Sequence, residues 1–241
     1  MVILSILYKR MIDRDQSAQI SKKQAIVPVL LGIVSTYLSF GIFIGVGLLF
    51  IQSGYVAEST PVLLRSFIGA FIMAGLPEEL SKLLMILLAL YLFRSTVTNV
   101  YEYVLIGMAV GFGFTLFEET LYGSGGAIFR LTGVAMHSAI NMIMAKHLAL
   151  AKYHKRTNNG SVAGEYALAI LLPVLIHSLY DMCTANNKFL ECTEPNLQLT
   201  GLILGILAAV LGVVIEVVVF VKTKQDAPKQ CEMRTVESAV K

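Results

Sequence analysis

Five stretches of this 241-residue chain are long and apolar enough to cross a lipid bilayer as helices. A helix needs roughly 20 apolar residues to traverse a hydrocarbon core of about 30 Å. The chain is therefore expected to fold as an all-α, polytopic transmembrane helical bundle. The five stretches are Ile26 to Gln52, Val100 to Tyr122, Ala127 to Leu150, Gly164 to Cys183 and Leu197 to Val221.

The composition agrees with a multi-pass protein of the cell membrane. Hydrophobic residues make up 56% of the chain and charged residues only 15%, whereas soluble domains carry about 25% charged residues. The net charge of +3 is too small to indicate a nucleic-acid partner. Three cysteines are too few for a disulfide framework. Cys183 and Cys192 both fall at the expected outer face, where an oxidising exterior could join them, and this possible disulfide is a hypothesis.

The segment from Pro61 to Phe93 decides the number of crossings. It is too long for one upright crossing and too short for two. If it crosses once, the chain makes six crossings and most basic residues lie on one side, which places both termini in the cytoplasm. Residues 61–76 would then form an interfacial, tilted or re-entrant segment. Pro77 lacks a backbone N–H and favours a helix start, so the crossing helix is predicted from Glu78 to about Arg94. The inner basic residues would be Lys9, Arg10, Arg14, Lys22, Lys23, Arg94, Lys146, Lys152, Lys155, Arg156 and those of the C-terminal tail.

This topology divides the chain into three parts. Residues 1–25 form a cytoplasmic N-terminal segment, residues 26–222 the transmembrane domain, and residues 223–241 a cytoplasmic polar tail. The tail after Thr223 is polar, and we expect it to be disordered.

A small set of ionisable residues lies inside the apolar segments. Burying a charge there costs several kcal/mol unless the charge is paired, neutralised or bound to a metal. Counted along the expected helices, His137 lies about ten residues, or about 15 Å, from the outer end of its span. His177 and Glu118 lie about seven and about five residues from theirs. Four segments thus place such groups in one outer-half layer, which indicates a shared site. The set is Glu78, Glu79, Lys82, Glu118, Glu119, His137, His177 and Asp181.

Helical spacing shows which of these residues can act together. His137 and Asn141 are four residues apart and share a helix face, as do His177 and Asp181. Two histidines and a carboxylate from three helices would make a zinc site with an open position for water. A further glutamate could act as general base on that water. Asp181 could hold the ring of His177 by accepting a hydrogen bond from its other nitrogen.

Four short motifs in chain order resemble a known family. The motifs EExxK, FxxxE, an HxxxH-like motif and an HxxxD-like motif are those of the PrsW family of intramembrane proteases. That family is distantly similar to the CAAX prenyl proteases and to bacteriocin-processing or immunity proteins. Glu118, at the end of FxxxE, favours the PrsW branch, whereas Asn141 is similar to the HxxxN of the CAAX branch. The segments that carry the resemblance are EELSK (78–82), GFGFTLFEE (111–119), HSAIN (137–141) and HSLYD (177–181).

The resemblance implies that residues 26–222 form a protease domain that cleaves a membrane-anchored protein. In PrsW-like proteins the substrate is an anti-sigma factor, cut near the extracytoplasmic face of the membrane. On this reading Glu118, His137 and His177 bind a metal, zinc. Glu78 or Glu79 activates the water that attacks the substrate. The supporting residues are Lys82, which positions the glutamates or compensates their charge, Asn141, which donates to the oxyanion, and Asp181 and Phe114, which surround the site.

Three alternatives remain open at this stage. A metal-free protease of the CAAX type would use a glutamate and a histidine to activate water directly. An ion or proton carrier would also place glutamates and histidines at membrane depth. A non-catalytic scaffold or immunity-type protein would keep the fold without the chemistry.

Overall fold

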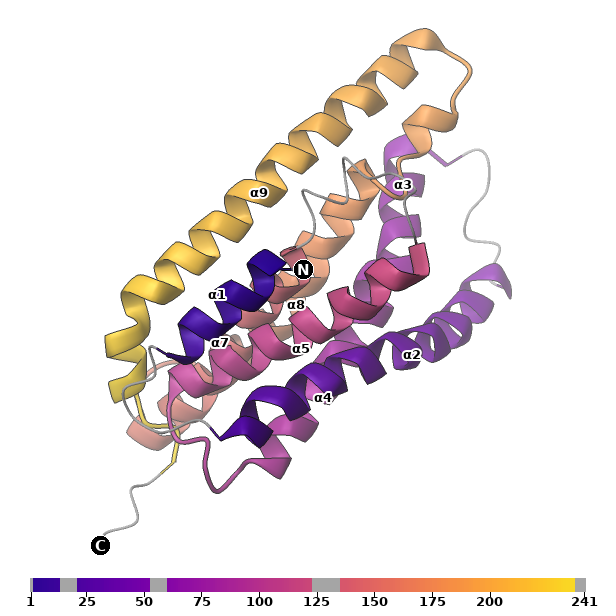
Figure 1. Ribbon diagram of the computed structural model, residues 1–241. Helices are drawn as coiled ribbons and strands as arrows, with labels where there is room; N and C mark the ends of the chain where they lie inside the picture. Colours follow the sequence, from indigo (N-terminus) through magenta and orange to yellow (C-terminus); the bar gives the residue numbers. More distant parts are fainter. Residues whose placement is uncertain (1, 14–20, 53–59, 123–134, 237–241) are drawn as a thin grey trace, which may run out of the picture.

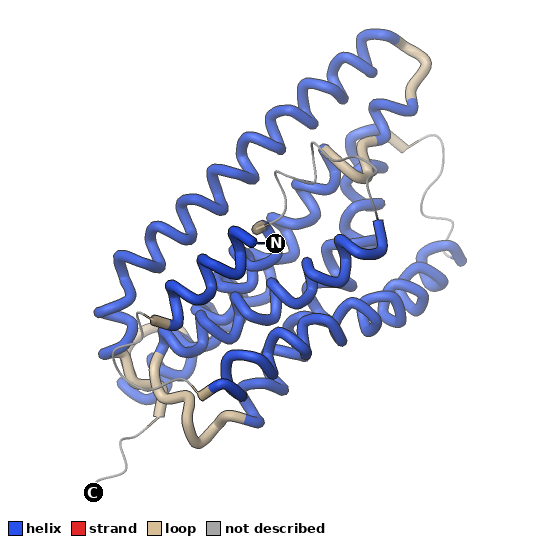
Figure 2. Tube along the Cα trace, in the orientation of Figure 1, coloured by secondary structure: helices blue, strands red, loops and turns tan. Residues whose placement is uncertain are grey.

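The computed structural model describes residues 2–13, 21–52, 60–122 and 135–236. Within these ranges the regular elements are helices (Figures 1 and 2), and the one β-bridge joins Asn99 to Arg234. The all-α prediction is therefore confirmed. The elements are α1 (Val2–Ile12), α2 (Lys22–Gln52), α3 (Val62–Ala70), η1 (Phe71–Gly75), α4 (Leu76–Leu92), α5 (Val100–Tyr122), α7 (Met136–Thr157), α8 (Val162–Cys183), η2 (Lys188–Glu191) and α9 (Pro195–Glu232).

Helix α5 is the centre of the bundle. Its apolar stretch is 89% buried, against 17–28% for α2, α8 and α9, which turn large aliphatic side chains outward. Glycines allow α7 to approach α5 closely. A Cβ atom on Gly111 would collide with the backbone carbonyl of His137, and one on Gly107 would collide with that of Asn141. This close approach brings the histidine at the start of α7 beside the face of α5 that carries Glu118.

Hydrogen bonds tie the helix ends together at one end of the bundle. The side chain of Gln24, at the start of α2, donates to the hydroxyl of Thr96 in the α4–α5 connection. Arg234, just after α9, donates to Thr98 in the same connection, and Arg156 near the end of α7 donates to the carbonyl of Arg234. The basic residues predicted for the inner side, such as Lys22 and Arg94, lie in these same segments.

Different elements meet at the opposite end. The backbone N–H of Lys188 in η2 donates to the hydroxyl of Ser66 in α3, and Asn187 donates to the carbonyl of Gly201 in α9. Among the described residues, six helical runs pass between the two ends (Figure 1): α2, α3–η1–α4, α5, α7, α8 and α9.

Four helices meet the length and apolarity needed to cross a membrane: α2, α5, α8 continued through η2, and α9. The two other runs, α3–η1–α4 and α7, carry charged and polar residues that lower their apolarity. Six crossings with both ends in the cytoplasm therefore remain a prediction.

The region around Pro77 differs from the prediction. A helix does not begin there, because α3, η1 and α4 form one continuous helix from Val62 to Leu92. Its η1 segment is a π-helical turn, in which the N–H of Leu76 donates to the carbonyl of Phe71, five residues earlier. Pro77 has no N–H to donate to Met73, and the wider turn accommodates this loss without ending the helix. The extra residue in the turn also rotates everything that follows it, including Glu78.

The C-terminal segment is more ordered than its composition suggests. The expectation of disorder after Thr223 is wrong for residues 223–236, since α9 continues to Glu232. Ala227, Gln230 and Cys231 are buried there, and Ala227 and Cys231 pack in a core cluster with α5. A short polar stretch can join a core through a few small side chains, which a composition count does not reveal.

The N-terminal segment also belongs to the bundle. In α1, Tyr8 and Met11 pack in the same cluster as Tyr101 and Phe112 of α5. The hydroxyl of Tyr8 donates to the carbonyl of Ala25 at 2.8 Å, and that of Tyr101 donates to the carbonyl of Met11 at 2.8 Å. The cytoplasmic location of residues 1–25 remains a prediction, but this segment is not a free appendage.

Candidate active site and metal centre

The structure brings the predicted polar residues of four helices together. Glu78 follows the π-helical turn in α4, Glu118 lies near the end of α5, His137 in the first turn of α7, and His177 near the end of α8. Glu78 is about 24 Å from the start of α3 and about 21 Å from the end of α4. The site is thus deeper along this run than the sequence count suggests. Because α5 and α8 end, and α7 begins, close to the site, it still lies toward the ends of these helices that are predicted to be outer.

The depth of His137 changes for a specific reason. The apolar stretch from Ala127 to Leu150 predicts a helix that begins well before this histidine. In the structure α7 begins at Met136. Residues 127–134, the first part of the predicted span, lie outside the described residues.

Lys82 is the hub of the cluster. Its side chain is fully buried, and its Nζ lies 2.7 Å from Glu79 Oε1 and 3.3 Å from Glu78 Oε2. The same nitrogen lies 2.8 Å from Nδ1 of His137 and 3.8 Å from the centre of the Phe114 ring. The predicted positioning role of Lys82 is consistent with this geometry, because one ammonium holds two carboxylates and one imidazole.

Glu79 and His177 form a buried pair. His177 Nδ1 lies 2.8 Å from Glu79 Oε1, the oxygen that also accepts from Lys82. Asp181 was expected to orient this ring, but its Oδ2 lies 3.6 Å from Nε2, longer than an ordinary hydrogen bond. Glu79 therefore takes the orienting position on Nδ1, and Nε2 faces Glu78, whose Oε2 is 3.8 Å away.

His137 is held from three sides. Its Nε2 lies 2.8 Å from Oε2 of Glu118, and the Phe114 ring packs 4.8 Å from the imidazole, centre to centre. Because the Lys82 ammonium can only donate, a neutral His137 ring would accept on Nδ1 and donate from Nε2 to Glu118. A metal ion bound to His137 would replace one of these two hydrogen bonds. The predicted packing role of Phe114 agrees with this contact.

Three residues lie close enough together to hold a metal ion. Glu78, His137 and His177 each offer a ligand atom, and these atoms all lie within 4.8 Å of one another. One carboxylate and two imidazoles are a usual donor set for a catalytic zinc ion. The structure thus groups Glu78 with the two histidines, whereas the sequence had favoured Glu118, which is hydrogen-bonded to His137 instead.

The charge of the cluster also fits a cation. Three glutamates and one lysine carry a net charge of minus two when both histidines are neutral, and Asp181 adds a further carboxylate at the margin. A buried excess of negative charge is costly inside a membrane. A divalent ion held by Glu78 and the two histidines would offset it.

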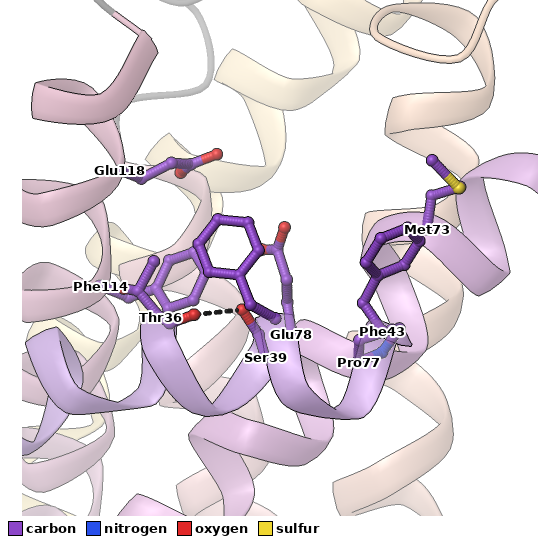
Figure 3. A pocket seen from close by; sticks show the side chains of 9 residues that line it. Thr36, Ser39, Phe43, Met73, Pro77, Glu78, Phe114 and Glu118 are labelled. Atoms are coloured by element: carbon purple, nitrogen blue, oxygen red, sulfur yellow. Dashed lines mark hydrogen bonds between the residues drawn. The ribbon is translucent and has the colours of Figure 1, made fainter. Parts of the chain in front are cut away.

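The three glutamates of the cluster differ in their access to a pocket. Glu78 and Glu118 line it, with side chains 14% and 21% exposed, whereas Glu79 is fully buried and does not line it. Figure 3 shows Glu78 and Glu118 on its walls beside Phe114. The pocket has a volume of about 170 Å³ and is partly open to the outside. Its lining residues are Thr36, Ser39, Phe40, Phe43, Met73, Pro77, Glu78, Phe114 and Glu118.

Two other predicted features lie differently. Asn141 is fully buried, its amide donates to the carbonyl of His137 at 2.7 Å, and it is not among the residues that line the pocket. Cys183 and Cys192 are free thiols, and Sγ of Cys192 lies 3.4 Å from the carbonyl of Lys188. The disulfide suggested by the sequence therefore remains a prediction.

The pocket wall from α2 was missed by the sequence analysis. Gly32, Ser35, Thr36 and Ser39 are all buried, and they recur at the spacing of one helix face. This stripe of small and hydroxyl residues in an otherwise apolar stretch was the available signal. It lies outside the four motifs.

Comparison with known proteins supports the same assignment. Residues 27–223 match the family described as PrsW family intramembrane metalloprotease. The chain is 29% identical over 155 residues to Protease PrsW of Halalkalibacterium halodurans. This aligned region covers 62% of this chain and 68% of that protein. It is 27% identical over 146 residues to Protease PrsW of Bacillus subtilis. This second aligned region covers 58% of this chain and 64% of that protein. No solved structure matches the chain. The matched region contains all four motifs and the whole cluster, and the chain belongs to the PrsW family of intramembrane metalloproteases.

Proposed function

We propose that this protein is a zinc-dependent intramembrane protease that cleaves a membrane-anchored protein in the pocket between α2, α4 and α5. The observation that carries the proposal is the convergence of Glu78, His137 and His177 beside a pocket that also exposes Glu118. A ligand set and a separate carboxylate on one cavity are what hydrolysis by an activated water requires.

The geometry supports a distinct role for each glutamate. Glu78, His137 and His177 would hold the zinc ion, which supplies Lewis-acid polarisation of the scissile carbonyl and activation of the attacking water. Glu118 faces the same pocket and is outside this ligand set, so it is placed to take a proton from the water. Glu79 orients His177, and Lys82 compensates the glutamates.

Asn141 has a supporting role in this proposal. Its amide is bonded to the first turn of α7. It thereby fixes the backbone that carries His137. The oxyanion role considered for it from the sequence remains a prediction for the second hydrogen of the same amide.

The substrate would be a membrane-anchored segment, such as that of an anti-sigma factor, cut from the extracytoplasmic side. Three helices end close above the cluster on the side opposite the basic end of the bundle. With the basic end in the cytoplasm, that side faces outward. A peptide bond presented there reaches Glu78 and Glu118 without passing the cytoplasmic half.

Metal content tests the proposal. Purified protein should contain about one zinc ion per chain, and His137→Ala, His177→Ala and Glu78→Gln should each lose it, because three ligands are needed to retain the ion. His147→Ala is the matched control. This histidine lies on α7 but pairs with Glu165, 2.6 Å away and outside the cluster, so its zinc content should equal that of the wild type.

The opposite outcome has a definite meaning. Wild-type protein that cleaves a peptide while free of metal would overturn the zinc mechanism. The contacts of 2.8 Å between His137 and Glu118 and between His177 and Glu79 would then favour the metal-free mechanism, in which a carboxylate and a histidine activate water. Ion flux without cleavage would instead support a carrier.

A further inference from the structure

The wall that α2 contributes to the pocket has a polar part and an apolar part, and the catalytic cluster does not explain this difference. Thr36 and Ser39 are 3% and 6% exposed and form a polar floor next to Glu78 and Glu118. Phe40 and Met73 are 48% and 52% exposed and form an apolar rim. Figure 3 shows Thr36 and Ser39 side by side on α2, with Phe43 and Met73 farther along the pocket.

One hydroxyl of the floor has no hydrogen-bond partner among the described residues. Ser35 donates to the carbonyl of Gly32 at 2.6 Å, and Ser39 donates to the carbonyl of Thr36 at 2.7 Å. Helical serine and threonine usually make such a bond to their own backbone. Oγ1 of Thr36 makes none with the described residues, although it is buried in the pocket wall. A buried hydroxyl is normally satisfied, so an unpaired one indicates a ligand that pairs with it.

A peptide undergoing cleavage supplies the missing group. Proteolysis requires an unwound stretch of substrate, whose N–H and C=O groups lose their helical partners. Inside a membrane these groups must be satisfied by the protein. A hydroxyl can donate and accept, so it suits either group.

We propose that the α2 wall is the substrate-binding wall of the pocket. The Thr36 hydroxyl hydrogen-bonds the unwound substrate backbone next to the scissile bond, and Phe40, Phe43 and Met73 receive an apolar side chain of the same segment. The substrate class is thus a membrane-spanning segment with an apolar residue beside the cut. This inference rests on the proposed protease function, but its contacts concern binding and can be measured separately.

The probe is a lysine-flanked apolar peptide of about 20 residues. It carries a fluorophore and a quencher at its ends and one varied central residue, which is alanine, leucine, phenylalanine or aspartate. It is reconstituted with the full-length protein in phosphatidylcholine vesicles. Both peptide binding and cleavage are measured, so that KM and kcat are separated.

Thr36→Val removes the hydroxyl and keeps the shape. We expect it to weaken peptide binding and raise KM about tenfold, as for the loss of one uncharged hydrogen bond. Thr36→Ser should stay close to the wild type because it keeps the hydroxyl. Ser35→Ala is the matched control, since its buried hydroxyl is on the same helix but does not line the pocket.

The apolar rim has its own test. Phe43→Ala should raise the preference for phenylalanine over alanine at the central position by at least about tenfold, because the subsite becomes larger. Ile44→Ala is the control, since Ile44 is the next residue on α2 and does not line the pocket. The peptide with a central aspartate should bind poorly to both variants, Phe43→Ala and Ile44→Ala.

Each outcome decides one of the two proposals. If Thr36→Val and Ser35→Ala have the same peptide binding and the same KM, the proposal of a substrate-binding wall is overturned, even if cleavage occurs. The absence of binding by wild-type protein overturns it as well. Binding that depends on Thr36 without any cleavage supports the wall and contradicts the protease.

Discussion

At the residue scale, one lysine determines how two acidic side chains, Glu78 and Glu79, coexist inside the bundle. The two oxygens of Glu79 differ: Oε1 accepts from Lys82 and His177, while Oε2 is buried with no partner among the described residues. Such an arrangement is stable only while the compensating charge remains, because an unpaired buried charge costs far more than a paired one.

Replacing Lys82 with methionine should therefore be strongly destabilising. We expect Lys82→Met to lower the free energy of unfolding by about 3–5 kcal/mol, since it leaves buried carboxylates uncompensated. The double variant Lys82→Met with Glu79→Gln should recover part of the loss, because the two residues are in contact and their effects are not additive. The measurement is reversible unfolding in mixed detergent micelles.

An exposed lysine provides the control for this prediction. The Lys146 side chain is 40% exposed and lies 4.0 Å from Asp226, so Lys146→Met should change stability by less than about 1 kcal/mol. Equal effects of the two substitutions would contradict the view that Lys82 compensates a buried cluster.

Residue roles could be predicted from the sequence only in part. Spacing along helices identified the cluster, since His137, His177, Glu78 and Lys82 do meet. It could not decide between Glu78 and Glu79, because adjacent residues point about 100° apart and either could face the pocket. The π-helical turn before Pro77 sets that rotation, and a turn of this kind has no reliable sequence pattern.

At the element scale, the contact between η1, which leads directly into α4, and α8 aligns the two halves of the site. Gly75 lies against α8, where an added Cβ would collide with the hydroxyl of Ser178 and lie 3.1 Å from the carbonyl of Val174. His177 is the neighbour of Ser178, so the spacing of these helices fixes the distance between His177 and Glu79.

Gly75→Ala should push the two helices apart. We expect it to lower stability by about 1–3 kcal/mol, as overpacking does in a close-packed interior, and to reduce peptide cleavage. Adding Ser178→Gly makes room for the new methyl group and should restore part of both. Gly45→Ala is the control, because nothing lies within 4 Å of that position and its effect should be small.

The elements themselves were predicted with uneven success. The apolar stretches behind α2, α5, α8 and α9 were visible because their composition alone demands burial or lipid. The continuous helix through Pro77 and the helical end of α9 were not. In both places the helix is kept by tertiary contacts, such as those of Ala227 and Cys231, against a local signal that favours a break or disorder.

At the scale of the whole molecule, the two ends of the bundle differ in charge. Lys152, Lys155 and Arg156 lie in the last part of α7, at the same end of the bundle as the start of α2 with Lys22 and Lys23 (Figure 1). By the positive-inside rule we predict that this end faces the cytoplasm and that the chain makes six crossings.

Cysteine labelling in intact cells checks this topology. In a variant whose three native cysteines are replaced by serine, Glu191→Cys should react with an impermeant thiol reagent. Asn159→Cys should react only after the membrane is opened, because the two exposed positions lie at opposite ends of the bundle. Labelling of both cysteines in intact cells would contradict the placement of these two positions on opposite sides of the membrane.

The packing of α1 has a consequence for biosynthesis. Tyr8 and Met11 share a core cluster with Tyr101, Ala227 and Cys231, so α1 contacts residues of α9 that are synthesised much later. A segment with such distant partners cannot complete its packing until synthesis is nearly finished. The packing of α1 is therefore completed only after the intervening helices have inserted, and it is a late step in the assembly of the bundle.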